Sequence, residues 1–256
     1  GHMYALDVDP IEIVKTKKRL EDKGYGEDIL TICQTNFANI DEVAENAGKF
    51  DFVLADLGVS SMQIDNPERG FSYKVEGPLD LRLDPEHGQS ASERLRSMSK
   101  EEFIGMMVEN SDEPYAEQIA KVVFQKLKRG AKFETTTELR EAIEEALCKL
   151  PPAEYKEVVK KSCARVFQAL RIDVNSEFEV LYTFLEKLPE ILKPGARVAI
   201  LTFHSGEDQL VKKSFKQLKK EGVYSDASED VIRPSAAECQ RNPRAKSTKL
   251  RWAVKA

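Results

Sequence analysis

The sequence predicts an α/β fold, with a mainly parallel sheet that is interrupted by a helical insertion. Short apolar runs alternate with helical patterns in the first third and the last third of the chain. The segment between them is helical in period throughout and rich in Glu and Lys. A length of 256 residues is ample for one large domain that carries an insertion. We therefore expect sheet segments at 4–91 and 162–256 and the helical insertion at 92–161.

The first third predicts three strands and one helix. The strands are MYALDV, ILTICQTNF and FDFVLADLG. The third is nearly all apolar, so we expect it to be buried on both faces. Between the first two strands, PIEIVKTKKRLEDKG predicts a helix that begins at Pro10 and ends near Gly24. The opening residues GHM are typical of a cloning remnant and are left out of the fold prediction.

The central segment predicts several helices, and the sheet then resumes. The helical patterns are SKEEFIGMMVEN, YAEQIAKVVFQKLKRG, TTTELREAIEEALCKL and AEYKEVVKKSCARVFQAL, and the threonine run of the third can cap its helix. After them, NSEFEVLYTFLEKLPEIL predicts an amphipathic helix, KPGA a turn, RVAILTF a strand and HSGEDQLVKKSFKQLKK a helix. Leu250, Trp252 and Val254 alternate as in a final edge strand.

Composition narrows the classes of function. No apolar run approaches the roughly 18 residues that a membrane-spanning helix needs. The four cysteines form no C-x-x-C pair, which favours neither a zinc site nor a disulfide framework. A net charge of −5 argues against a uniformly basic nucleic-acid binder. The segment QRNPRAKSTKLRWAVKA is nevertheless basic and holds no acid, which suits either phosphate contact or a solvated tail.

Polar residues follow three of the predicted strands. In an open parallel sheet, ligands lie across the carboxyl ends of the strands, so these residues are the candidates for a site. Asp7 follows the first strand and suits a nucleoside ribose, whereas Asp9 suits a helix N-cap. Asp56 ends another strand, and His204 follows a third, where a structural role and a catalytic role are equally plausible.

A nucleoside site without a P-loop motif leaves two enzyme classes, dinucleotide-dependent oxidoreductases and S-adenosylmethionine methyltransferases. Both usually carry a glycine-rich loop before the ribose acid. Only GHM precedes YALDVDP here, so we expect the first strand and its glycine loop to be missing from this chain. We expect weak cofactor binding and impaired catalysis as a result.

Six blocks of the sequence, in order, resemble the RsmH (MraW) family of ribosomal RNA methyltransferases. They are YALDVDP, NFANI, DLGVSSMQIDNPERGFSYKVEGPLDLRLDP, RVFQALRIDVNSEFEVL, LTFHSGEDQLVK and RPSAAECQRNPRAKSTKLRWA. The resemblance implies a methyltransferase-type sheet and S-adenosyl-L-methionine as the cofactor. It also implies N4-methylation of a cytidine in the decoding region of small-subunit ribosomal RNA. The chain departs from the family at Gly206, where F-H-S-L-E-D is usual, and at Ser162 and Cys163, where His-Pro is usual.

The resemblance also implies a set of site residues, and we predict no metal-binding residue. Those expected at the cofactor are Asp7 at the ribose, Phe37 at the adenine, and Asp56 and Gln63 after the second strand of the site. Those expected in catalysis are Asp56, Ser60 and His204. Those expected at the RNA are Arg69, Phe71, Tyr73, Arg171, Arg241, Arg244, Lys246 and Lys249.

Several alternatives stay open at this level. Asp56 suits the cofactor or the target amine, but a carboxylate at this place can also close a turn through backbone N–H groups. Arg69, Phe71 and Tyr73 suit a surface that receives an unstacked base, or a loop that packs against the sheet. A non-catalytic RNA-binding or ribosome-assembly protein on the same scaffold is the competing function. The chain is expected in the cytoplasm if bacterial, or in a chloroplast or mitochondrion if eukaryotic, as a monomer or a homodimer.

Overall fold

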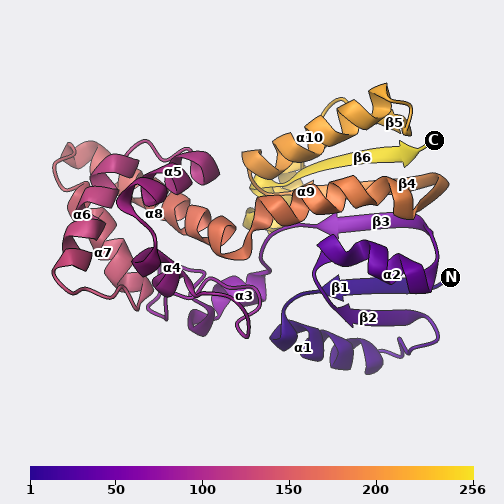
Figure 1. The fold of residues 1–256 in the computed structure, drawn as a ribbon, viewed down its shortest axis with the longest axis horizontal. Helices are drawn as coiled ribbons and strands as arrows, with labels where there is room; N and C mark the ends of the chain where they lie inside the picture. Colours follow the sequence, from indigo (N-terminus) through magenta and orange to yellow (C-terminus); the bar gives the residue numbers. More distant parts are fainter. The chain divides into compact units, whose positions relative to one another are not determined.

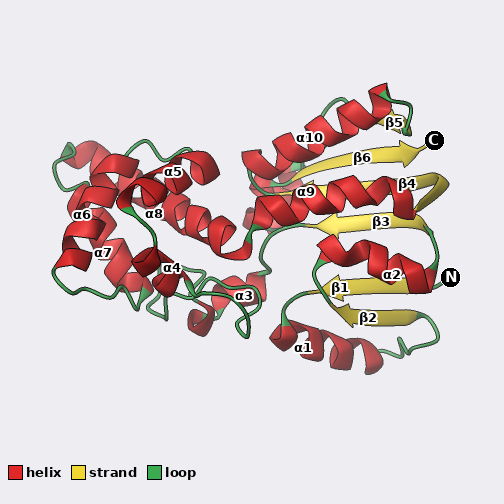
Figure 2. Cartoon of the chain, in the orientation of Figure 1, coloured by secondary structure: helices red, strands yellow, loops and turns green.

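The computed structural model describes residues 1–256, which divide into two compact units. The sheet unit comprises Gly1–Gly58 and Phe178–Ala256, and the helical unit comprises Val59–Glu177. Figure 2 shows strands in the sheet unit only, and helices and loops in the helical unit. The mixed α/β fold that the sequence predicts is confirmed. The domain boundaries at 91/92 and 161/162 were drawn from sequence texture and stay a prediction.

The sheet unit contains all the strands (Figure 1). They are β1 (Met3–Asp7), β2 (Leu30–Gln34), β3 (Phe50–Asp56), β4 (Leu192–Thr202), β5 (Tyr224–Ala227) and β6 (Lys249–Lys255). Its helices are α1 (Pro10–Glu21), α2 (Ile40–Ala47), α9 (Glu177–Lys187), α10 (Ser205–Lys220) and α11 (Ala236–Arg241), with 3-10 turns η1 (Phe37–Asn39), η3 (Leu188–Ile191) and η4 (Pro243–Ser247). Glu177, the first residue of α9, is the last residue of the helical unit. β1 begins at Met3, the first residue of the predicted strand MYALDV.

The strands form two hydrogen-bonded sheets. β1 pairs with β2 in parallel, and a second sheet has the order β3-β4-β6-β5. β3 is parallel to β4, while β6 is antiparallel to both β4 and β5. The prediction that the last strand lies at an edge is therefore wrong. It failed because β5, whose sequence YSDA lacks an apolar run, supplies the true edge.

The start of β4 also differs from the prediction. The KPGA segment lies inside β4 instead of forming a turn before it. Between Phe50 and Phe52, the register with β4 jumps from Leu192 to Arg197, so the extra residues are accommodated as an irregularity in the ladder. Gly195 has φ of +78°, a conformation that glycine adopts without steric cost and that allows the chain to bend there.

The two faces of the larger sheet differ sharply in burial. Val198, Ile200 and Ala253 point to one face and are fully buried in a core to which α9 and α10 contribute. The opposite face carries Phe52 and Leu54 of β3, which are 55% and 58% exposed. The prediction that this strand is buried on both faces is therefore wrong.

The exposed face is hollowed. Phe52 pairs with Arg197 in the sheet register, and Ala199 pairs with Trp252 on the next strand. These four residues line a hollow of about 460 Å³ together with Val198, Asp226, Ala253 and Val254. A strand whose sequence is apolar on both sides thus packs only one side within the sheet unit.

Tyr224 places a buried hydroxyl in the core of the sheet unit, and this hydroxyl affects stability. Its side chain is 1% exposed, its ring packs edge-on against Phe215, and its hydroxyl has no hydrogen-bond partner. Burial raises the pKa of this hydroxyl, so it stays neutral. Because Tyr224→Phe removes an unsatisfied buried group without creating a large cavity, we expect the free energy of unfolding to rise by about 1 kcal/mol.

The chain offers its own probe and control for this change. Trp252 is the only tryptophan and lies in β6, so its fluorescence follows unfolding of the sheet unit in urea. Tyr182→Phe, at a side chain that is 55% exposed, is expected to change stability by no more than about 0.5 kcal/mol. A clear loss of stability in Tyr224→Phe would show that the hydroxyl has a partner.

The helical unit is built from capped helices around its own core. Its elements are α3 (Ser61–Asp65), η2 (Pro67–Arg69), α4 (Ala91–Ser97), α5 (Lys100–Ser111), α6 (Ala116–Lys128), α7 (Thr136–Ala146) and α8 (Pro152–Asn175). Capping boxes begin α3, α4, α5 and α7, and the one at Thr135 and Glu138 confirms the predicted threonine cap. Buried side chains such as Phe103, Ile119 and Leu139 pack between these helices. None of the helices in the structure combines the length and the apolar character that crossing a membrane requires.

Candidate functional site

The candidate site residues of the sheet unit gather at the carboxyl ends of its parallel strands. The arrows of β1, β2 and β3 point the same way in Figure 1, and β4 runs parallel to β3. Asp7 is the last residue of β1, Asp56 is the last residue of β3, and His204 follows β4 by two residues. This edge of a parallel sheet is where α/β proteins bind their ligands.

Asp7 and Asp9 have different roles in the structure. An Asp9 carboxylate oxygen accepts hydrogen bonds from the N–H groups of Ile11 at 2.9 Å and Glu12 at 3.3 Å, which confirms Asp9 as the N-cap of α1. The Asp7 Oδ1 atom accepts from the Asp9 N–H at 2.9 Å. Burial raises the pKa of the Asp7 carboxyl, and this effect outweighs the opposing effect of that hydrogen bond. Asp7 is therefore the acid of the pair that is not committed to a helix end.

Phe37 is held firmly next to the end of β2. It begins η1, which is capped by the Asn36 side chain. Its ring meets the ring of Phe184 edge-on, with centroids 5.2 Å apart. The Lys187 ammonium donates a hydrogen bond to the Ala38 carbonyl at 2.9 Å, which ties η1 to α9. Phe37 is only partly buried, so part of the ring remains available to a planar ligand.

Asp56 closes β3 with a carboxylate that is largely exposed. Partial burial of its carboxyl group raises the pKa, because the charged form loses hydration there. No hydrogen bond from a backbone N–H to this carboxylate is present in the structure. The alternative role, closing a turn through backbone N–H groups, thus finds no support in its contacts.

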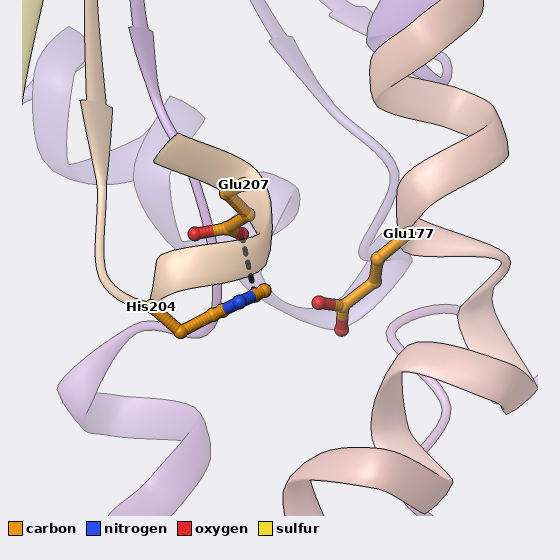
Figure 3. Close-up of side chains that lie close together, drawn as sticks. All are labelled: Glu177, His204 and Glu207. Atoms are coloured by element: carbon orange, nitrogen blue, oxygen red, sulfur yellow. Dashed lines mark ion pairs between the residues drawn. The ribbon is translucent and has the colours of Figure 1, made fainter. Parts of the chain in front are cut away.

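His204 lies at the N-terminus of α10 beside Glu207 (Figure 3). The His204 Nε2 atom lies 3.3 Å from Glu207 Oε1, and the His204 side chain is 11% exposed. The other Glu207 oxygen accepts a hydrogen bond from the Phe203 N–H at 3.0 Å, which fixes the carboxylate against the end of β4. The third residue drawn in Figure 3, Glu177, pairs with Arg171 of the helical unit at 2.7 Å.

Ser60 and Gln63 form the capping box of α3. The Ser60 N–H donates to the Gln63 side chain at 2.7 Å, and the Gln63 N–H donates to the Ser60 hydroxyl at 3.2 Å. Gln63 is 6% exposed. Both residues belong to the helical unit, whereas Asp56 belongs to the sheet unit, so a joint role of the three stays a prediction.

The side chains predicted to receive the RNA base in the helical unit, Arg69, Phe71 and Tyr73, contact other parts of the same unit. Arg69 is 5% exposed, and its guanidinium donates to the carbonyls of Arg82 at 3.0 Å and Leu83 at 2.8 Å while lying over the Phe71 ring. Tyr73 packs against Phe167, with ring centroids 5.8 Å apart. These contacts all lie within the helical unit, and packing of the loop against the sheet, the alternative role, stays a prediction. Their role toward RNA stays a prediction.

The remaining predicted RNA contacts fall into two groups. Arg241, Arg244 and Lys246 are exposed on α11 and η4. Arg171 forms a two-pronged pair with Glu177, and Lys249 lies 3.6 Å from the Asp208 carboxylate. The first group carries its charge at the surface of the sheet unit, and the second group pairs with carboxylates of the protein. Contact of either group with RNA stays a prediction.

The sequence did not predict the buried ion pair between Arg251 of β6 and Asp208 of α10. Arg251 is 4% exposed, and its guanidinium donates to Asp208 at 2.7 Å and 3.3 Å. Burial acts to raise the pKa of Asp208, but the hydrogen bond and charge of Arg251, helped by Lys249, hold it below its ordinary value. One signal was present, since Arg251 lies two positions before Ala253 and so on the same, inward side of β6.

Comparison with known proteins places the chain in a family. A family model described as the MraW methylase family matches residues 1–256. Ribosomal RNA small subunit methyltransferase H 1 of Lachnoclostridium phytofermentans is 68% identical over 256 residues, which cover 100% of this chain and 70% of the relative. Ribosomal RNA small subunit methyltransferase H 2 of Alkaliphilus metalliredigens is 59% identical, over 100% of this chain and 73% of the relative. Ribosomal RNA small subunit methyltransferase H of Prochlorococcus marinus (strain MIT 9215) is 38% identical, over 98% of this chain and 79% of the relative. The chain therefore belongs to the MraW methylase family, as its six sequence blocks predicted.

Proposed function

We propose that the protein transfers a methyl group from S-adenosyl-L-methionine to the N4 amine of a cytidine in the decoding region of small-subunit ribosomal RNA. Family membership and the names of the relatives support the methyl transfer and the class of RNA. The structural observation that carries the proposal is the pair of acids, Asp7 and Asp56, at the carboxyl ends of parallel strands in the sheet unit. The bacterial relatives favour the cytoplasm over an organelle as the site of action.

The residues of the sheet unit fit a nucleoside cofactor. Asp7 offers a carboxylate at the end of β1 to ribose hydroxyls, and Phe37 offers a partly exposed ring to an adenine. When bound, S-adenosyl-L-methionine supplies an electrophilic methyl on a sulfonium. Asp56 carries a carboxylate that suits either the cofactor or the target amine.

Methyl transfer to cytosine N4 needs an acceptor for the amine. The nitrogen lone pair is delocalised into the ring, so the amine must be turned and polarised before its attack on the methyl carbon. The N–C bond forms as the S–C bond breaks, and a positive charge develops on the nitrogen. The Asp56 carboxylate accepts a hydrogen bond from this amine, stabilises the charge and takes up the proton that is lost.

The RNA must present its cytidine outside a helical stack. An exocyclic amine inside a paired helix lies out of reach, so the substrate is a single-stranded or loop cytidine. Arg241, Arg244 and Lys246 contact the phosphate backbone around it, a role that their exposure on one short stretch of the sheet unit supports.

A methyl-transfer assay tests this proposal. We expect the protein to incorporate labelled methyl from S-adenosyl-L-methionine into unmethylated small ribosomal subunits or their RNA. Digestion to nucleosides and mass spectrometry should then find N4-methylcytidine. RNA binding without any methyl transfer would instead support the ribosome-assembly protein, and a methyl on another atom would refute the N4 assignment.

A further inference from the structure

Gly206 leaves a space that the ring of Phe178 fills. A Cβ atom at position 206 would lie 2.6 Å from Phe178 Cζ and 2.9 Å from its Cε1, distances that real Cβ atoms do not adopt. It would also lie 3.3 Å from Nδ1 of His204. Phe178 and Gly206 therefore occupy one site between them, and a side chain at 206 requires the Phe178 ring to move.

The Phe178 ring packs against the imidazole of His204. The two ring centroids lie 5.7 Å apart with an interplanar angle of 59°. Both imidazole nitrogens are buried and have no hydrogen-bond partner, although Nε2 lies 3.3 Å from Glu207 Oε1. Hydrogen bonds thus do not fix the orientation of the imidazole, and packing must do so.

Glu207 cannot supply that orientation alone. Its Oε2 atom is fixed by the Phe203 N–H, so its position is set by the end of β4 and not by the histidine. Rotation of the imidazole about its bond to Cβ would move Nε2 away from Glu207 Oε1. The Phe178 ring opposes that rotation by occupying the adjacent volume.

We propose that Phe178 is a positioning residue that holds the His204 imidazole beside Glu207, and that Gly206 is its required partner. For activity, this inference rests on the proposed function and on the predicted role of His204 in catalysis. Phe178 acts through His204. It also explains why this chain tolerates a glycine in the first turn of α10: the lost packing of a larger side chain is replaced by Phe178.

Histidine NMR tests the positioning without any need for catalysis. The chain holds only His2, His87 and His204, and a His204→Asn variant assigns the third set of ring signals. We expect Phe178→Leu to move the His204 ring signals, because the ring current of Phe178 is lost and the imidazole gains freedom. The signals of His87, which is exposed in the helical unit, serve as the control.

A double-mutant cycle tests the pairing. Gly206→Leu alone forces Phe178 away, and Phe178→Ala alone leaves the imidazole loosely packed, so both should broaden or move the His204 signals. The two changes together should restore one fixed imidazole orientation, seen as narrow His204 signals that lack only the ring-current shift of Phe178. In the methyl-transfer assay, we expect each single change to lower kcat by about 10-fold or more, with little change in KM for the cofactor, and the double variant to recover. Circular dichroism confirms that each variant is folded.

The outcomes separate the two proposals. Unmoved His204 signals in Phe178→Leu, or additive effects in the cycle, would overturn the positioning role. A moved spectrum with unchanged kcat would overturn it as well. If the native chain transfers no methyl at all while the spectra behave as expected, the proposed function fails and the positioning of His204 stands.

Discussion

Replacing Asp56 with alanine is expected to lower the rate of methyl transfer by roughly 10²–10³-fold, the effect of removing one group that stabilises charge in a transition state. Asp56 is exposed at the last position of β3, so the change leaves the core of the sheet unit intact. The loss should therefore appear in kcat and not in folding. Labelled methyl transfer under single-turnover conditions measures it directly.

Asp56→Asn is the matched control. Asparagine keeps an acceptor oxygen but no charge, so it should retain part of the orientation of the amine and lose the stabilisation of its positive charge. Because partial burial raises the pKa of the Asp56 carboxyl, the rate of the native protein should fall as the pH is lowered through that raised value. Methylation that proceeds unchanged in Asp56→Ala would remove this residue from the site.

Replacing Arg251 with alanine is expected to destabilise the sheet unit by about 3 kcal/mol, because it removes the main partner of the Asp208 carboxylate. The guanidinium contributes contacts at 2.7 Å and 3.3 Å to that carboxylate, and Lys249, which pairs with it at 3.6 Å, offsets only part of their loss. Urea unfolding followed by Trp252 fluorescence reports on the unit that contains the pair.

An exposed pair in the same unit provides the comparison. Lys219 lies 2.8 Å from Asp226, with side chains that are 38% and 55% exposed, and Lys219→Ala should change stability by no more than about 1 kcal/mol. Replacing both Arg251 and Asp208 with apolar residues should recover part of the loss, since no charge is then left buried. Equal effects for the buried and the exposed pair would contradict this account.

Acid should weaken the Arg251 and Asp208 pair in a defined range. The folded carboxyl has a pKa below its ordinary value, so its contribution is complete above about pH 4, where the unfolded carboxyl is ionised. The contribution is lost as the pH falls through the lowered pKa. In the variant without Arg251, this part of the acid dependence should be smaller, because only Lys249 then lowers the pKa of Asp208.

Local patterns predicted much of the fold, because local forces decide those elements. Pro10 after a capping acid, and the threonine run before Leu139, favour the start of a helix through hydrogen bonds and backbone angles of neighbouring residues. These local effects do not depend on what surrounds the helix. The ends of β1 and β3 could be predicted for the same reason, and these two positions supply Asp7 and Asp56.

The rest depends on partners that are distant in sequence. An apolar strand such as FDFVLAD can be covered on one face or on both, and its sequence does not distinguish the two cases. The exposure of Phe52 could therefore not be predicted. β5 is a strand only because β6 pairs with it. Gly206 looks like a loss of packing until Phe178, 28 positions earlier in the sequence, is found in the vacant space.

The open face of the larger sheet has a consequence for handling the protein. Phe52 and Leu54 keep apolar surface in water, and the cost of that exposure depends on the solvent. Sulfate and phosphate increase this cost, and warming from the cold increases it as well, so both conditions favour association of these surfaces. Solubility should thus respond to the choice of salt and temperature well before the fold does, and chilled solutions free of sulfate suit this chain best.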